Sequence, residues 1–325
     1  AGQNNGSTWS NAYLSLQRAL EVAITGDQIW VAKGTYSPGN LVTSTFTLKE
    51  GVKIYGGFAG TESLLTERDN LKIRSENQTV LNGNNINRHV VYNNQALTKA
   101  TILDGFTISE GRTALANGET GYGAGIYNSR GATEFRNLWI KNNNGYCYGG
   151  GMYNAGTSEI NNVIFEGNST LGGTLSNGGG LYNSGTNILT AISFVNNKAA
   201  RQGGGLYATG KATITNATFN GNSSVFQGGG MYFNSGTVVL KNAVFSRNKV
   251  TGTAAYYGGG YYQYSATATL VNVTMSNNSI AYVNAVVANR YGGGIFKNAG
   301  TLNLQNSILW NNSRGNGLLD EMNTG

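Results

Sequence analysis

The sequence predicts an all-β solenoid, a parallel β-helix of roughly ten coils with a helical cap at its N-terminal end. Seven glycine clusters recur along the chain, and each precedes an alternating run that ends in a bulky apolar residue three positions before an asparagine. The distance from the last glycine of a cluster to the bulky residue is always 14 or 15 residues. The distance from the asparagine to the last glycine of the next cluster varies from 8 to 16 residues. Stacked repeats behave in this way, because insertions fall on one face that often binds ligands. The seven clusters end at Gly125, Gly151, Gly180, Gly205, Gly230, Gly260 and Gly294.

The cap is expected in residues 1–26. Between positions 7 and 25, Trp9, Leu16 and Leu20 recur near helical spacing, Ser10 is a suitable N-cap, and Gly26 a suitable end. A cap is needed because an uncovered solenoid end exposes apolar core and unpaired strand edges.

Irregular coils are expected over residues 27–120, with the most charged stretch, 61–77, as a protruding loop. Regular coils follow over 121–325 in the same continuous domain. The absence of a recognisable cap after Asn312 favours a chain that belongs to a longer protein. In the regular coils we expect inward side chains at Leu181, Leu206, Met231, Phe165, Phe194, Phe219 and Phe245. We expect a ladder of asparagines, a residue that tolerates left-handed backbone, at Asn168, Asn197, Asn222, Asn248, Asn278 and Asn312.

The pairing of Gly179-Gly180-Leu181 with Phe194-Val195-Asn196-Asn197 resembles the repeat of chlamydial polymorphic outer-membrane proteins and related right-handed parallel β-helices of pectin-lyase-like fold. The runs 26–36 and 52–62 are similar to the openings of large secreted surface proteins of Bacteroidetes type. The resemblance implies a right-handed coil and a protein that is secreted or displayed on the outer membrane. The lack of Asp and Glu over positions 167–319 favours a non-enzymatic role as an adhesin, a binding module or a stalk-like display element.

Charge and cysteine content restrict the possible partners. Only 11% of residues are charged, the net charge is +7, and positions 167–319 contain no Asp or Glu. Such a basic surface aids solubility or attracts an anionic glycan. Because the cations are dispersed and no reader module is present, nucleic acid is not expected as a partner. No stretch approaches the roughly 20 apolar residues of a membrane span, and the single Cys147 precludes an internal disulfide.

An enzyme is the alternative, because relatives of the pectin-lyase-like fold include polysaccharide lyases and glycoside hydrolases acting on acidic glycans. Glycoside hydrolysis usually needs two carboxylates beside the scissile bond. The candidates are Asp104, Glu110 and Arg112, although Asp-Gly is first a turn signal and Glu110 with Arg112 suits a surface ion pair. No run of spaced Asp residues supports calcium, so no cofactor is expected unless calcium binds at this group. His89 lies in an alternating strand pattern, which favours a structural role.

The main binding candidate is a file of aromatic residues, each one position after an inward residue and therefore facing outward. These are Tyr127, Tyr153, Tyr182, Tyr207, Tyr232, Tyr262 and Phe296. They either stabilise neighbouring coils through ring contacts or form a platform for sugar rings or for another protein. The long returns 169–178, 249–258 and 279–292, with Tyr257, Tyr282 and Arg290, are a second candidate surface. The expected partners are a glycan, a host or cell-surface protein, and secretion or anchoring machinery.

Ice binding is a third class, since flat β-helices perform it with regular Thr-x-Thr rows. Thr43-Ser44-Thr45 and Thr267-Ala268-Thr269 are isolated in the aligned repeats. We therefore expect no threonine column and no ice binding.

Overall fold

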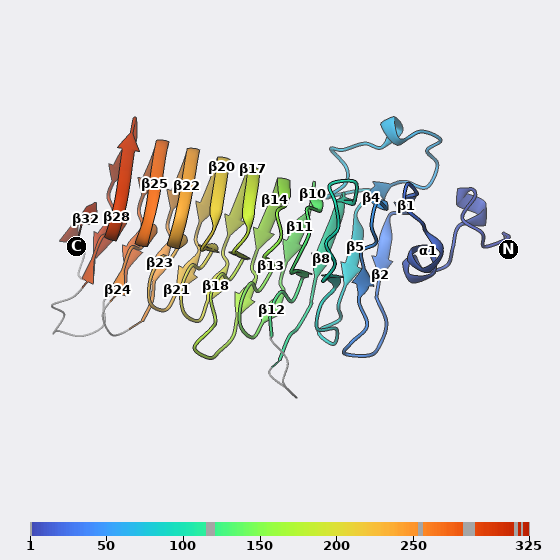
Figure 1. Cartoon of the computed structure of the whole chain (residues 1–325), viewed down its shortest axis with the longest axis horizontal. Helices are drawn as coiled ribbons and strands as arrows, with labels where there is room; N and C mark the ends of the chain where they lie inside the picture. The colour runs from blue at the N-terminus through green and yellow to red at the C-terminus, as the bar shows by residue number, and fades with distance from the viewer. Residues whose placement is uncertain are drawn as a thin grey trace.

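The chain folds into a parallel β-solenoid of about 8 turns in which 48% of residues are in strands. Figure 1 shows the coils of this computed structural model stacked along one axis. The structure describes residues 2–114, 121–252, 256–281, 290–314, 318–319 and 321–324. The expected ten coils exceed the observed turns slightly. Ten strand segments, from β1 to β28, pair in sequence along one face.

The largest sheet has 22 strands and winds around the rod. Its strands pair in parallel, each residue one coil from its counterpart, as in Phe165, Phe194 and Phe219. Its members are β1 (Gln28–Ala32), β2 (Gly34–Tyr36), β3 (Phe46–Thr47), β4 (Lys53–Phe58), β5 (Thr79–Asn82), β6 (Val91–Asn93), β7 (Ile102–Asp104), β8 (Phe106–Ser109), β9 (Ile126–Asn128), β10 (Glu134–Arg136), β11 (Trp139–Lys141), β13 (Met152–Asn154), β14 (Glu159–Glu166), β16 (Leu181–Asn183), β17 (Thr186–Val195), β19 (Leu206–Ala208), β20 (Lys211–Asn220), β22 (Met231–Ser246), β25 (Tyr261–Ser276), β28 (Ile295–Gln305), β29 (Ile308–Trp310) and β32 (Met322–Thr324).

A second sheet of 8 short strands follows the asparagine ladder in each regular coil. These strands lie along the lower edge of the rod in Figure 1, where the returns of variable length also project. They are β12 (Asn144–Gly145), β15 (Ser169–Thr170), β18 (Lys198–Ala199), β21 (Ser223–Ser224), β23 (Lys249–Val250), β26 (Ser279–Ile280), β30 (Ser313–Arg314) and β31 (Leu318–Leu319). A further pair joins β24 (Tyr256–Tyr257) to β27 (Arg290–Tyr291).

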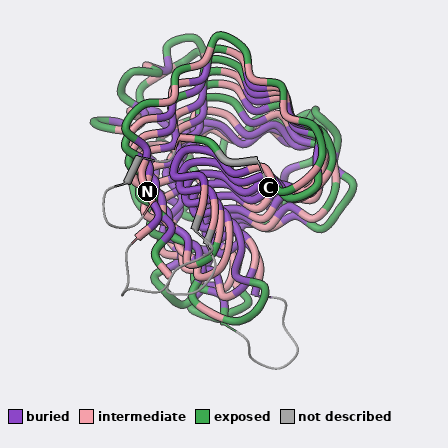
Figure 2. Tube along the Cα trace, turned by 90° about the vertical axis from the view of Figure 1, so that its left-hand side faces the viewer, coloured by how far each residue is buried: buried purple, intermediate pink, exposed green. Residues whose placement is uncertain are grey.

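The core follows the predicted pattern. Viewed along the rod, the coils superimpose and their buried residues fall into continuous lines (Figure 2). The predicted inward residues are at most 1% exposed. Phe165, Phe194, Phe219 and Phe245 stack with ring centroids 4.2 to 5.0 Å apart. Burying each such side chain stabilises the fold by about 1.5–3 kcal/mol.

The asparagine ladder is also confirmed, and Asn143 extends it. In each coil the backbone N–H and the Nδ2 of one asparagine both donate to Oδ1 of the next, as from Asn168 to Asn197 at 3.0 Å. The same Nδ2 donates to a backbone carbonyl, that of Ile140 for Asn168. The expectation of left-handed backbone at the ladder was wrong by one position. Positive φ occurs instead at the residue before each ladder asparagine, as at Asn196. The ladder asparagines themselves are buried.

The glycine clusters are required by close backbone approach. A Cβ at Gly204 would lie 2.3 Å from the Gly229 carbonyl oxygen and 2.4 Å from that of Ser223. The preceding Gly203 has φ +67°, which a side chain would strain. At the glycine clusters the backbones of neighbouring coils therefore approach too closely for any residue with a side chain.

The N-terminal cap differs from the prediction. The helix α1 covers only Leu16–Val22, with Ser15 instead of Ser10 as N-cap, and residues Trp9–Asn11 form a separate 3-10 turn, η1. Leu16 and Leu20 do pack on the first coil as expected. No helix among the described residues is long and apolar enough to cross a membrane.

The charged segment 61–77 connects β4 to β5 and projects from the rod in Figure 1. It contains the 3-10 turn η2 (Leu65–Glu67) and is anchored by two arginines. Arg68 is only 8% exposed, and Nη2 of Arg74 donates to the carbonyls of Leu138 and Asn162. The loop is therefore fixed against the side of the solenoid.

Candidate functional site

Asp104, the first candidate catalytic residue, ends β7 and is only 5% exposed. Its Oδ1 accepts from Arg68 Nη2 and from Asn137 Nδ2, each at 2.9 Å. The Arg68 guanidinium also donates to the Gly56 carbonyl and lies 5.5 Å from the Tyr55 ring centroid. Asp104 therefore neutralises a buried cation, and breaking such a pair is destabilising because it leaves a charge buried.

Glu110 and Arg112 lie in the turn after β8. Glu110 has φ +58°, and its carbonyl accepts from the Asn85 N–H. Arg112 is exposed and forms an isolated bridge with Asn144. No hydrogen bond or ion pair joins Asp104, Glu110 and Arg112, and the described residues contain no group of three side chains suited to a metal ion.

His89 belongs to an aromatic stack. Its ring lies 5.5 Å from Tyr92 and 5.0 Å from Tyr127, and its Nδ1 is 2.9 Å from the Gly123 carbonyl. That carbonyl makes Nδ1 the donor. Burial lowers the pKa of His89 to about 4, so the ring is neutral at physiological pH.

The aromatic file extends by one residue at its start, to Tyr92, and runs along the rod to Phe296. Successive ring centroids lie 4.8 to 5.5 Å apart, and the planes are within 7 to 19° of parallel. Each ring face is therefore covered by the ring of the next coil. Tyr207, Tyr232, Tyr262 and Phe296 are only 4 to 7% exposed and form a hydrophobic cluster separate from the main core.

Electrostatics agree with this packing. Burial raises the pKa of Tyr207 and of Tyr262 to about 12, so both hydroxyls stay protonated in any physiological setting. Sugar stacking needs an open aromatic face, which the inner members of the file lack. The geometry thus favours the structural interpretation of Tyr182 and Tyr207 over the platform.

A second aromatic column lies beside the file; the sequence analysis named its member Tyr257 as a loop residue but did not identify the column. Each member is the last residue of a return, directly before a glycine cluster: Tyr122, Tyr148, Tyr257 and Tyr291. Tyr148 lies 4.3 Å from Tyr182, and Tyr257 lies 4.4 Å from Phe296, measured between ring centroids. All four rings are only partly buried.

Amide side chains occupy the middle of this second column. Gln202 Nε2 donates to Gln227 Oε1 at 2.6 Å, and the backbone of Gln227 forms an isolated parallel bridge with that of Tyr257. At the far end, the Arg314 guanidinium lies 5.4 Å from the Tyr291 ring. The column is recognisable in the sequence as the position before each glycine cluster.

Two residues of the predicted loop surface lie outside the described part, namely Tyr282 and the side chain of Arg290. The return 169–178 is described in full. It closes on itself through Thr170 Oγ1, which donates to the Ser176 carbonyl at 3.0 Å, and Ser176 Oγ donates to the Tyr146 carbonyl at 3.0 Å. This insertion is therefore ordered against the preceding coil.

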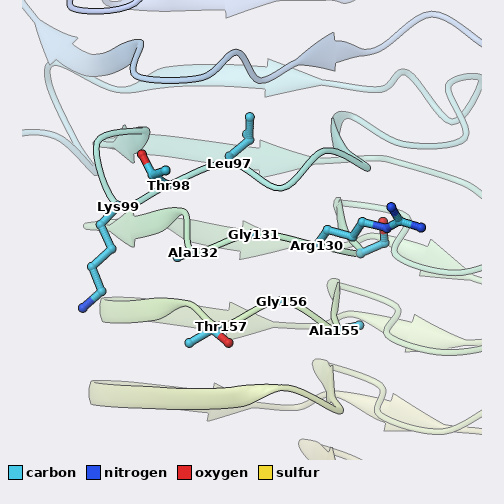
Figure 3. Close-up of a pocket in the computed structure, with 10 residues that line it drawn as sticks. Leu97, Thr98, Lys99, Arg130, Gly131, Ala132, Ala155, Gly156 and Thr157 are labelled. Atoms are coloured by element: carbon cyan, nitrogen blue, oxygen red, sulfur yellow. The ribbon is translucent and has the colours of Figure 1, made fainter.

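A shallow depression lies over the turns before β10 and β14 (Figure 3). Its floor is made of small residues, including Gly131, Ala132 and Gly156, and it measures about 670 Å³. Lys99 and Arg130 stand at two of its edges in Figure 3. Lys99 is paired with Glu159, whereas Arg130 is exposed and forms no ion pair within the described residues.

The expectation that no threonine column exists was wrong. Strand register aligns threonines of β17, β22, β25 and β28, with one lysine between the first two. The aligned positions are Thr186, Lys211, Thr237, Thr267 and Thr301. Variable coil lengths hid this alignment in the sequence. The adjacent outward columns are mixed and include Ile188, Lys241 and Gln305, so the face is not a regular hydroxyl array.

No family model, no curated protein and no solved structure matches this chain. The class that the fold defines is a parallel β-solenoid.

Proposed function

We propose that this protein is a non-enzymatic binding and display module of a secreted or surface-exposed protein, as the pectin-lyase-like and polymorphic outer-membrane resemblance implies. One observation supports this most: the returns place partly buried tyrosines on a single side of the rod. Tyr148 and Tyr257 are the last residues of two such returns. Tyrosine offers a flat face and a polar tip, which suits contacts with a glycan or a protein surface.

The rigid part of the rod supports a display role. The asparagine ladder connects each regular coil to the next, and four stacked phenylalanines add contacts in the middle coils, so the loops are held at fixed spacing. Binding residues are commonly placed on loops that a rigid scaffold positions. The proposed contact surface is therefore the second aromatic column with the adjacent returns, and the expected partner is a glycan or a cell-surface protein.

The lyase alternative gains little from the geometry. Asp104 is committed to Arg68, and a catalytic lysine would need a lowered pKa. At the depression of Figure 3, the hydrogen bond from Lys99 to Glu159 raises the lysine pKa instead. The depression thus suits electrostatic contact with an acidic group better than proton abstraction.

A glycan array and a cell-binding assay test the proposal. The double variant Tyr148→Ser with Tyr257→Ser removes two partly buried rings of the column, and we expect it to lose binding. The matched control is Tyr264→Ser, which removes a tyrosine that is 48% exposed outside this column. Equal binding by the double variant and the control would refute the proposed surface.

A further inference from the structure

A groove of about 1010 Å³ lies at the N-terminal end of the solenoid, away from the returns. It is bounded by residues 5–16, by α1, by β1 and by the turn at 60–63. This volume is at the upper end of the range for small-molecule sites, about 300–1,000 Å³. Nothing in the proposed loop surface involves these residues.

The groove exists because α1 begins only at Leu16 and the segment before it does not continue that helix. Trp9 sits in η1 and its Nε1 donates to the Glu62 carbonyl at 2.8 Å. Its ring also lies 5.5 Å from the Phe58 ring. The segment is thus held at Trp9 and again at Ser15, which caps α1, and the groove opens between these two attachments and β1.

Four aromatic residues line the groove: Trp9, Tyr13, Trp30 and Tyr36. The Trp30 ring stacks on the Phe58 ring, with centroids 4.9 Å apart and planes 9° from parallel. The Trp9 ring is tilted by 43° against the Trp30 ring. Both indoles remain half-buried. This differs from the aromatic file, where a ring from the next coil covers each face, because Trp30 has only one parallel stacking partner.

The polar side chains of the groove are hydroxyls, amides and two carboxylates, and no cation is among them. Asp27 and Glu62 are its only charged side chains, and no Lys or Arg lines it. Both Glu62 oxygens accept backbone N–H groups of residues 59–61. Asp27 Oδ2 accepts from the Ile24 N–H, which leaves its Oδ1 for a ligand hydroxyl.

We propose that this groove binds a neutral saccharide. The apolar face of a sugar ring fits against half-buried aromatic rings, and sugar hydroxyls donate to carboxylate and amide oxygens such as those of Asp27 and Gln28. An anionic sugar is disfavoured because its charge would face two carboxylates without a cation. Tyr13, whose hydroxyl has no hydrogen-bond partner among the described residues, forms the outer wall.

The test uses neutral tetrasaccharides, namely β-1,4-glucan, α-1,4-glucan and chitin tetramers, with tetragalacturonate as the acidic counterpart. Because two of the four tryptophans line the groove, binding is read from tryptophan fluorescence. The background variant Trp139→Phe with Trp310→Phe assigns the signal to Trp9 and Trp30. We expect at least one neutral tetramer to bind with a Kd below about 10 mM, and tetragalacturonate not to bind.

Tyr13→Ala should weaken the binding of that tetramer by about fivefold or more, since it removes one aromatic wall without touching the core. Asp27→Asn keeps an acceptor for the Ile24 N–H and should weaken the binding of the tetramer less than Tyr13→Ala does. The control Tyr264→Ala should bind as the unaltered protein does, and thermal unfolding checks that Tyr13→Ala is folded. The proposal is overturned if no neutral tetramer binds, if tetragalacturonate binds equally well, or if folded Tyr13→Ala binds unchanged.

Discussion

Replacing Asn222 by alanine tests whether the asparagine ladder holds the coils together. Asn222 is fully buried, and its side chain makes four hydrogen bonds across three coils. It accepts from the N–H and Nδ2 of Asn197, and it donates to the Phe194 carbonyl and to Asn248 Oδ1. Alanine removes all four and leaves the Asn197 N–H without its partner in the core.

The expected loss is about 4–6 kcal/mol, from roughly 1 kcal/mol per hydrogen bond plus the cost of unpaired buried groups. The control is Asn220→Ala, two positions away, which is half-buried and loses one hydrogen bond from Ser246. It should cost less than about 1 kcal/mol. Urea unfolding followed by circular dichroism measures both variants.

Hydrogen exchange then locates the effect. Because a solenoid is stabilised by contacts between neighbouring repeats, the loss should appear first as faster exchange in the two coils beside Asn222. If Asn222→Ala stays within about 1 kcal/mol of the unaltered protein and exchange over 194–197 is unchanged, the ladder does not hold the coils together.

Three further outcomes are expected. Ala191 has φ +55° where neighbouring coils have asparagine, so Ala191→Asn should raise the free energy of unfolding by about 1 kcal/mol in urea titrations; a loss would contradict the strain argument. Because burial holds the pKa of His89 at about 4 against 6.5 in the unfolded chain, the unfolded chain takes up the proton first as the pH falls. Native stability should therefore drop between pH 6.5 and 4 by up to about 3 kcal/mol, and His89→Gln should show a smaller drop over that window. Asp104→Ala should cost about 3–5 kcal/mol by leaving Arg68 unpaired, whereas Arg68→Met with Asp104→Leu should recover most of it, as measured by thermal unfolding.

The regular coils were predictable because their constraints repeat. An inward phenylalanine and a ladder asparagine contact their own counterparts one coil away, so the same residue type recurs at the same offset. The left-handed position was assigned one residue late because asparagine occupies both sites, as in Asn196 and Asn197. Sequence period alone does not separate two adjacent asparagines with different backbone conformations.

The N-terminal segment was mispredicted because its determinants are not local. Trp9 and Leu16 recur near helical spacing, yet Trp9 is held by Glu62, 53 residues further on. A tertiary hydrogen bond and an aromatic contact with Phe58 outweigh the weak helix propensity of residues 7–14. The candidate groove depends on that contact, so it was not visible in the sequence.

The two kinds of aromatic site in this rod follow from one geometric rule. Where tyrosines occupy the same position in successive coils, strand spacing stacks their rings and each ring covers its neighbour, as from Tyr182 to Tyr207. An open ring face is then expected only where the series is interrupted or ends. Tyr257 follows Gln227 in the second column, and Trp30 lies in β1, where its one parallel stacking partner is Phe58. Recognition by this solenoid should therefore concentrate at such interruptions, and a longer unbroken tyrosine file would add stability without adding a binding surface.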